Sequence, residues 1–170
     1  YTPNPGGPGQ GWDSVGRLRI GLVNPSTVDL EFRLVHATTG APVTIPLFKL
    51  VFLDIDGRQQ TNFECVTPLT APAHVVLTPT TLLTQTVDLD GTRYCHNDDA
   101  PNAFSDSALT QAQQDAAVTL IYTDTDVARV RLGAYVGGLP ANKFFQITGA
   151  LSDQFVLPDC AFPSPPPTTP

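Results

Sequence analysis

One run of residues, Phe48 to Asp56, constrains the fold of this chain more strongly than any other stretch; it reads F-K-L-V-F-L-D-I-D. Side chains of a β-strand point alternately to its two faces, so a strand with one exposed face carries polar residues on that face. Here both faces are apolar, with Phe48, Leu50 and Phe52 on one and Val51, Leu53 and Ile55 on the other. Lys49 is the only polar residue before Asp54. The run therefore predicts a central strand that is covered on both sides.

Two aspartates, Asp54 and Asp56, end this run, and the alternation places them on the same face of the strand. Like charges this close repel each other unless a cation or hydrogen-bond donors lie between them. Gly57 then turns the chain, and Glu64 and Cys65 return toward the same region. The end of this strand is therefore a place where a polar site is expected.

Proline and glycine divide the chain into short segments, since 17 prolines and 13 glycines are spread over its 170 residues. Strand candidates recur about every ten residues, with turn signals between them. They are residues 17–23, 28–35, 48–55, 63–67, 74–78, 82–87, 92–95, 118–123, 127–136 and 143–151. The one helix-like stretch, 110–117, is a short connector that Thr110 can N-cap. This spacing predicts an all-β fold, an immunoglobulin-like or jelly-roll β-sandwich of about seven to nine strands.

The two ends differ in composition from the middle, which divides the chain into a Gly/Pro-rich linker (1–16), a β-sandwich domain (17–157) and a Pro/Thr-rich tail (158–170). Proline has no backbone N–H, so neither end suits a helix or the interior of a sheet. The tail favours extended polyproline II geometry, and its mixture of Pro with Ser and Thr is typical of O-glycosylated stalks. The expected modification sites are Pro165, Pro166, Pro167, Thr168 and Thr169.

Charge and hydropathy argue against two classes of partner. The net charge of -7 argues against a nucleic acid, because binding phosphates requires clustered Lys and Arg. No apolar run approaches the length of a membrane span.

The chain has no methionine and starts at Tyr1, so we expect it to be a processed or excised piece of a longer product. Abundant Thr, Pro and Gly with few lysines favour an extracellular location.

Three cysteines allow one intrachain disulfide with one cysteine left over. Cys65 and Cys95 both lie on strand candidates, and we favour a bridge between them over two buried free thiols. Cys160 lies in the tail, where it can form an interchain bridge or remain unpaired.

Five acidic residues are the best candidates to converge on a cation: Asp54, Asp56, Glu64, Asp98 and Asp99. Calcium takes six to eight oxygen ligands, and an Asp-x-Asp pair with later acids is compatible with a structural calcium site. The spacing does not match an EF-hand. The alternative is that these are ordinary solvated or hydrogen-bonded aspartates at a strand end. A carboxylate pair can also serve a glycoside hydrolase, but no aromatic-lined cleft is indicated around it.

No motif in the sequence indicates an enzyme. The three histidines, His36, His74 and His96, lie in separate segments without zinc-ligand spacing. There is no G-x-S-x-G nucleophile elbow and no glycine-rich phosphate loop after a strand. We therefore expect a protein that is not an enzyme.

Four motifs in a fixed order carry a resemblance to a known family: F-L-D-I-D, E-C-V-T, Y-C-H-N-D-D and L-T-Q-A-Q-Q-D-A-A-V-T-L-I-Y. Together with Phe144 and Phe145 before Gly149, they resemble a domain repeated in secreted proteins of algae and oomycete-like protists. The resemblance covers residues 17–151. With the proline-rich tail, the chain looks like a module of algal extracellular-matrix or surface-fibre glycoproteins. The loop G-R-Q-Q-T-N-F after Asp56 departs from the family, which is usually richer in glycine there.

The function expected from this combination is structural: a subunit or repeat module of a secreted, O-glycosylated extracellular fibre, matrix or cell coat. Its partners would be copies of itself and O-linked glycans. Phe155, Val156 and Leu157 form an apolar patch beyond the last strand candidate and are the expected assembly residues. The alternative to assembly is a linker that joins independent domains. The alternative function is a calcium-dependent carbohydrate-binding module, and an enzyme ranks third.

Overall fold

The computed structural model describes residues 11–12, 16–23, 25–58, 62–96, 98, 108–136 and 142–150. The first strands are β1 Gly11–Trp12, β2 Leu18–Val23, β3 Ser26–Arg33, β4 Ile45–Leu53, β5 Gly57–Arg58 and β6 Asn62–Pro68. The remaining elements are β7 His74–Val76, β8 Thr84–Asp88, β9 Gly91–His96, α1 Gln111–Asp115, β10 Val118–Thr125, β11 Val127–Val136 and β12 Asn142–Ala150. Strands thus form at the predicted positions, and short edge strands raise their number above the expected seven to nine.

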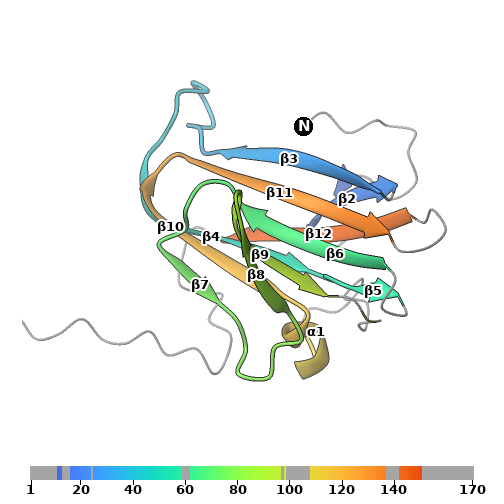
Figure 1. Ribbon diagram of the computed structural model, residues 1–170. Coiled ribbons are helices and arrows are strands. Elements are labelled where there is room, and N and C mark those ends of the chain that lie inside the picture. The colour runs from blue at the N-terminus through green and yellow to red at the C-terminus, as the bar shows by residue number, and fades with distance from the viewer. Residues whose placement is uncertain are drawn as a thin grey trace, which may run out of the picture.

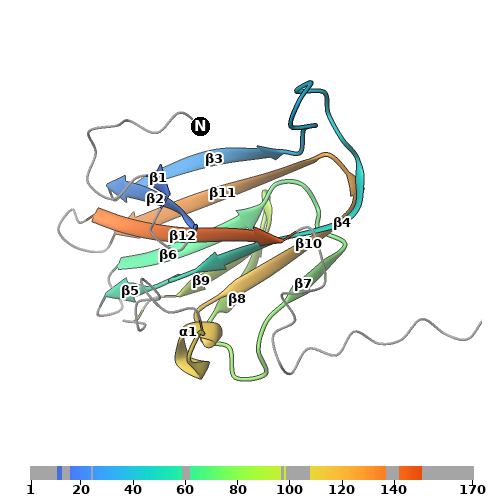
Figure 2. The same cartoon turned by 180° about the vertical axis from the view of Figure 1, so that it is seen from behind.

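Two antiparallel sheets pack face to face, which confirms the all-β sandwich (Figures 1 and 2). One sheet has the order β1-β2-β12-β4-β10-β7, and the other has the order β3-β11-β6-β9-β8, with β5 paired to β6. The eight longest strands are, in chain order, β2, β3, β4, β6, β9, β10, β11 and β12. If they are numbered 1 to 8 in that order, one sheet has the strand order 1-8-3-6 and the other has the order 2-7-4-5. Among the described residues this is the strand order of a jelly roll, the second of the two expected topologies.

The core between the sheets is built from the apolar alternation of the strands. Phe52, Val66, Leu120, Val130 and Leu132 are buried in one cluster that draws on both sheets. β4 lies between β12 and β10, which confirms that the run from Phe48 is a central strand. Truncating a large buried side chain such as Phe52 or Leu120 to alanine costs about 2–5 kcal/mol of stability.

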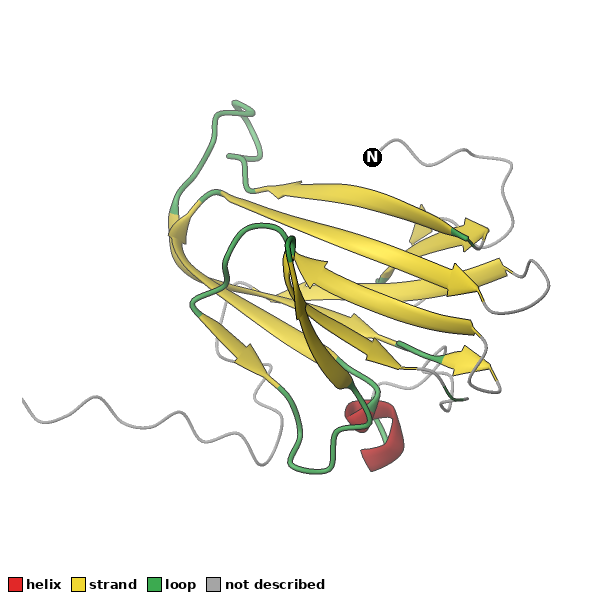
Figure 3. Cartoon of the chain, in the orientation of Figure 1, coloured by secondary structure: helices red, strands yellow, loops and turns green. Residues whose placement is uncertain are grey.

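The outer face of β4 is also partly covered. Val51 and Leu53 are buried there with Ala117, and Leu109 packs against them. These contacts place the residues on either side of α1 against the first sheet. Figure 3 shows the helix, in red, beside the ends of the strands. The side chain of Thr110 accepts a hydrogen bond from the backbone N–H of Gln113, which confirms the predicted N-cap. A strand covered on both faces therefore explains why the run is apolar throughout.

The Asp90-Gly91 turn signal is also confirmed, because β8 and β9 form a hairpin in which Asp88 pairs with Gly91. Gly91 has a φ of +112°, a conformation that side-chain-bearing residues rarely adopt. In the part of the chain that the structure describes, no helix is long and apolar enough to cross a membrane.

Candidate functional site

The first candidate site lies where β4 ends. The strand stops at Leu53, and Asp54 has a φ of 61°, in the left-handed region that residues other than glycine seldom adopt. This change in backbone direction breaks the alternation of side chains. The prediction that Asp54 and Asp56 share one face is therefore wrong: the two carboxylates bond to different partners on either side of β12.

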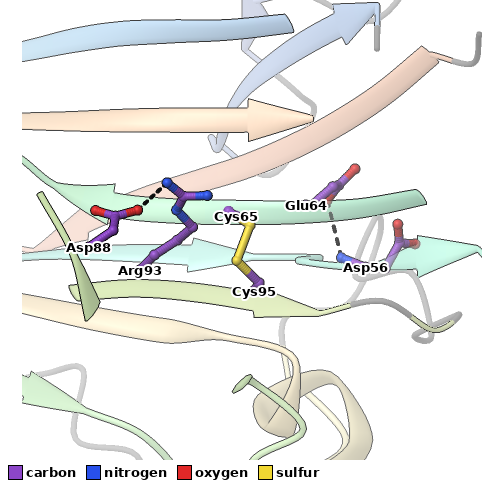
Figure 4. The surroundings of a disulfide bond; sticks show 6 residues. All are labelled: Asp56, Glu64, Cys65, Asp88, Arg93 and Cys95. Atoms are coloured by element: carbon purple, nitrogen blue, oxygen red, sulfur yellow. Dashed lines mark hydrogen bonds and ion pairs between the residues drawn. A yellow bond between two sulfur atoms is a disulfide. The ribbon is translucent and has the colours of Figure 1, made fainter. Parts of the chain in front are cut away.

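Asp56 lies between the two sheets. Lys143 of β12 donates a hydrogen bond from Nζ to Asp56 Oδ1 at 2.9 Å, and its Nζ is 3.9 Å from Glu64 Oε1 of β6. Glu64 Oε2 accepts a hydrogen bond from the backbone N–H of Asp56 at 3.1 Å (Figure 4). The ion pairs thus connect a residue of the first sheet with one of the second. One ammonium group thus lies close to the carboxylates of both Asp56 and Glu64.

Asp54 lies on the opposite side of β12. Gln146 lies three positions after Lys143, so the two side chains leave opposite faces of the strand. Gln146 donates from Nε2 to Asp54 Oδ2 at 3.5 Å, and Arg17 donates from Nη1 to Gln146 Oε1 at 3.0 Å. Asp54 Oδ1 is buried and has no hydrogen-bond partner among the described residues. Asp54 is therefore a buried carboxyl group in which only one of the two oxygens accepts a hydrogen bond from a described residue.

Burial shifts the acidity of two carboxyls in this cluster. Burial, and secondly the charge of Asp56, raise the pKa of Asp54 to about 7. The same two causes raise the pKa of Glu64 well above its usual range, against the opposing charge of Lys143. The cluster can therefore take up protons near neutral pH, and its chemistry is proton binding within the sandwich.

Of the residues predicted to hold calcium, the four that the structure describes, Asp54, Asp56, Glu64 and Asp98, are not brought together as one ligand set. Among the described residues, no group of three or more His, Cys, Asp or Glu has a geometry that could hold a metal ion. Asp98 is exposed, and its backbone oxygen accepts a hydrogen bond from Gly57 N at 2.8 Å. Asp99 lies outside the described residues. Calcium binding stays a prediction.

The predicted disulfide joins Cys65 of β6 to Cys95 of β9. The two residues lie directly opposite each other in the sheet, with their Cα atoms 4.2 Å apart. Figure 4 shows the bridge beside the ion pair of Asp88 and Arg93. Cys65 faces outward, because its neighbours Glu64 and Val66 face the core. Cys160 lies outside the described residues, so its partner stays open.

A second candidate site is the edge formed by β8, which the sequence did not identify. All five residues of β8 are exposed, and β8 pairs only with β9 among the described strands. Val87 is 78% exposed, and Leu89 in the following turn is fully exposed. The Asp-Gly turn signal predicts the hairpin, but nothing local indicates which of its strands lies at an edge. The predicted assembly residues Phe155, Val156 and Leu157 lie outside the described residues, as do the modification sites Pro165, Pro166, Pro167, Thr168 and Thr169.

Comparison of the chain with protein-family models, curated proteins and solved structures gave no match. The resemblance to algal and protist domains therefore stays a prediction. Function is inferred from the fold and from these sites.

Proposed function

We propose that this chain is a structural module of a secreted, O-glycosylated extracellular fibre, matrix or cell coat, and that copies join at the edge strand β8. It has no catalytic role in this proposal. The observation that carries the proposal is the open edge of β8 with its exposed apolar residues.

Natural sheets protect their edges with short strands, charged side chains or prolines, because unpaired N–H and C=O groups accept further strands. Two edge strands in the described residues, β1 and β7, have only two and three residues. A third, β3, carries alternating charges at Asp29, Glu31 and Arg33. β8 reads T-Q-T-V-D and has neither lysine nor proline. Its edge is therefore the least protected of the four.

We assign the place beside β8 to residues 155–157 of a neighbouring copy. The sequence Phe155-Val156-Leu157 is apolar and has high β-propensity, and Pro158 limits how far such a strand extends. Its side chains would cover Val87 and Leu89. A contact between the tail of one copy and the edge of the next is heterologous, so it propagates into a filament unless the rotation closes a ring.

The disulfide supports a location outside the cytosol, since structural disulfides form and persist in oxidising compartments. The sandwich itself supports a load-bearing role, because its two sheets are joined by the Asp56–Lys143–Glu64 ion pairs at one end. The tail composition supports O-linked glycans as a hydrated covering between modules.

The test compares the full chain, secreted by a eukaryotic host that modifies it, with a truncation that ends at Leu151. Sedimentation velocity and electron microscopy measure assembly at increasing concentration. We expect the full chain to form filaments and the truncation to remain monomeric. A full-length, natively modified chain that stays monomeric at high concentration would overturn the proposal.

A substitution on the edge separates the role of β8 from that of the tail. Val87→Lys places a charge on the edge, and we expect it to abolish assembly while the fold persists. Val23→Lys is the matched control, because Val23 is also an exposed valine at 62%, at the end of β2. Assembly of the Val87→Lys variant at the wild-type level would exclude β8 as the contact.

A further inference from the structure

A hollow of about 250 Å³ lies on the outer face of the second sheet, away from the carboxylate cluster. Its lining residues come from three neighbouring strands, β6, β9 and β8: Phe63, Thr84, Thr86, Arg93, Cys95 and His96. Cys95 pairs with Thr84 on one side and with Cys65 on the other, so the disulfide holds β9 in place under the hollow. The position is therefore fixed by a covalent bond as well as by the sheet.

The aromatic side chain of Phe63 borders this hollow, and contacts with its neighbours fix the orientation of its ring. The ring of Phe63 stacks on the ring of Tyr135, with centroids 5.2 Å apart and an interplanar angle of 22°. The Tyr135 ring lies over Gly133, where an added Cβ would come within 2.4 Å of it. The guanidinium of Arg93 lies 5.3 Å from the Tyr135 centroid, within cation–π range. Glycine at position 133 thus allows the pair of rings to lie flat on the sheet.

The charges beside the hollow are already matched. Arg93 forms an ion pair with Asp88, and Arg131 of β11, beyond β6 in the sheet, forms ion pairs with Asp29 and Asp90. An anionic ligand would have to displace a carboxylate from Arg93, and a cationic ligand would meet the guanidinium. The hollow therefore favours an uncharged ligand.

Several polar groups in the lining can still accept or donate hydrogen bonds. Thr84 and Thr86 are exposed on the face that borders the hollow. Arg93 Nε is buried and has no hydrogen-bond partner among the described residues. Buried polar atoms without partners are rare in folded proteins and cost free energy. A ligand with several hydroxyl groups would supply the missing partner of Arg93 after a small side-chain rotation, and it would also bond to the two threonine hydroxyls.

We propose that this hollow binds one uncharged sugar residue, with an apolar face of the sugar against Phe63 and its hydroxyl groups toward Thr84, Thr86 and Arg93. A mixture of one aromatic face and a few convergent polar groups is typical of small-ligand sites. The volume lies below the roughly 300–1,000 Å³ of pockets for drug-sized ligands, which limits the site to a single ring. The site needs no metal ion, and it does not depend on the assembly proposed above.

The test titrates the full, disulfide-bonded chain with methyl glycosides of glucose, galactose, mannose, xylose and arabinose, measured by NMR chemical shifts. We expect at least one uncharged glycoside to shift the amide signals of Phe63, Thr86 and Arg93, with no change after chelation of calcium. Absence of binding by all of these glycosides at tens of millimolar would overturn the proposal. Tighter binding of a uronic acid than of its uncharged counterpart would overturn the assignment to an uncharged sugar.

Two variants keep the test specific. Thr86→Val retains the shape and the β-propensity of the residue but removes its hydroxyl, so we expect about fivefold weaker binding. The matched control is Thr27→Val, on an exposed outward position of β3 in the same sheet. Phe63→Leu should weaken binding about tenfold, and its melting temperature establishes that the fold persists. Wild-type affinity in both Thr86→Val and Phe63→Leu would contradict the site.

The source of the sugar is a separate question with its own comparison. A glycosylated peptide that corresponds to residues 161–170 presents sugars of the protein's own tail, and an unmodified peptide of the same sequence is its control. Soluble polysaccharides built from the glycosides that bind present a matrix source. Shifts at Phe63 with the glycopeptide alone assign the tail of another copy, whereas shifts with the polysaccharides alone assign the matrix.

Discussion

Adjacent residues of β6 point into two regions that contain the same kinds of charged groups. One region is buried inside the sandwich, and the other is on its solvent-exposed outer face. Glu64 points into the end of the sandwich, where it meets Asp56 and Lys143, while Cys65 points to the outer face with its exposed ion pairs. In the interior, burial raises the pKa of Glu64. On the outer face, a hydrogen bond from Arg131 lowers the pKa of Asp29. Burial dominates the shift of Glu64, whereas the hydrogen bond from Arg131 dominates that of Asp29.

The difference concerns stability as well as acidity. A buried charge that loses its partner cannot be solvated, whereas an exposed one exchanges its partner for water. Substitutions of matching type in the two regions should therefore have unequal effects on the free energy of unfolding.

The largest effect is expected from Lys143→Met. Lys143 is buried, and its removal leaves Asp56 and Glu64 without their cation. We expect a loss of about 3–5 kcal/mol in the free energy of unfolding, measured by urea denaturation at pH 7. A loss below about 1 kcal/mol would mean that the cluster is solvated like the outer face.

The disulfide should contribute slightly less. Replacing both cysteines, as Cys65→Ala with Cys95→Ala, removes a cross-link between residues 30 positions apart. In the chain-entropy model this costs about 3–4 kcal/mol. Reducing agent should lower the melting temperature of the wild type and leave that of the double variant unchanged. Alkylation of Cys65 in the native protein would contradict the bridge.

The third prediction concerns the response to pH. Burial raises the pKa of Asp54 from its unfolded value of 3.8 to about 7 in the folded state. Between these two pH values the folded state keeps the proton that the unfolded state has lost, so protonation stabilises the folded state there. This contribution to stability is present at low pH and is lost as the pH rises through about 7. Lowering the pH from 8 to 5 should therefore stabilise the wild type relative to Asp54→Asn by about 3 kcal/mol.

Denaturation curves of both proteins over this pH range measure the difference. Glu64 titrates in both proteins, so most of its contribution cancels, although Asp54→Asn also removes one of the charges that raise the pKa of Glu64. Parallel pH profiles for the two proteins would show that Asp54 keeps an ordinary pKa.

The smallest effect is expected on the outer face. Arg131→Met removes the ion pairs with Asp29 and Asp90, whose side chains are largely solvent-accessible. We expect a loss below about 1 kcal/mol, which added salt should reduce further. A loss as large as that of Lys143→Met would remove the contrast between the two regions.

The sequence predicted features that depend on local pattern. Apolar residues on both faces of β4 identified it as central, the Asp90-Gly91 pair predicted a hairpin, and Thr110 predicted an N-cap. The disulfide was also anticipated, because its two cysteines lay on separate strand candidates. In each case the deciding information lies within a few residues.

The features that escaped prediction depend on distant contacts. The positive φ of Asp54 breaks an alternation that its neighbours imply, and Lys143, which pairs with Asp56, lies 87 positions away in the chain. The exposure of β8 follows from its place in the sheet order. The hollow joins Phe63 to residues of β8 and β9, which only the sheet brings together. Sequence patterns fix a strand's faces but not its neighbours.

The bridge between β6 and β9 also determines how the domain responds to mechanical force. Within the described part of the chain, β9 pairs with β6 at three positions, Glu64↔His96, Cys65↔Cys95 and Val66↔Tyr94. Without a cross-link, tension on the β8–β9 hairpin could peel it from the sheet by breaking these few hydrogen bonds in turn. With the bridge, the tension passes through a covalent bond into β6, which lies between β11 and β9 in the sheet. A pull on the outermost strand is thus carried by the centre of the domain.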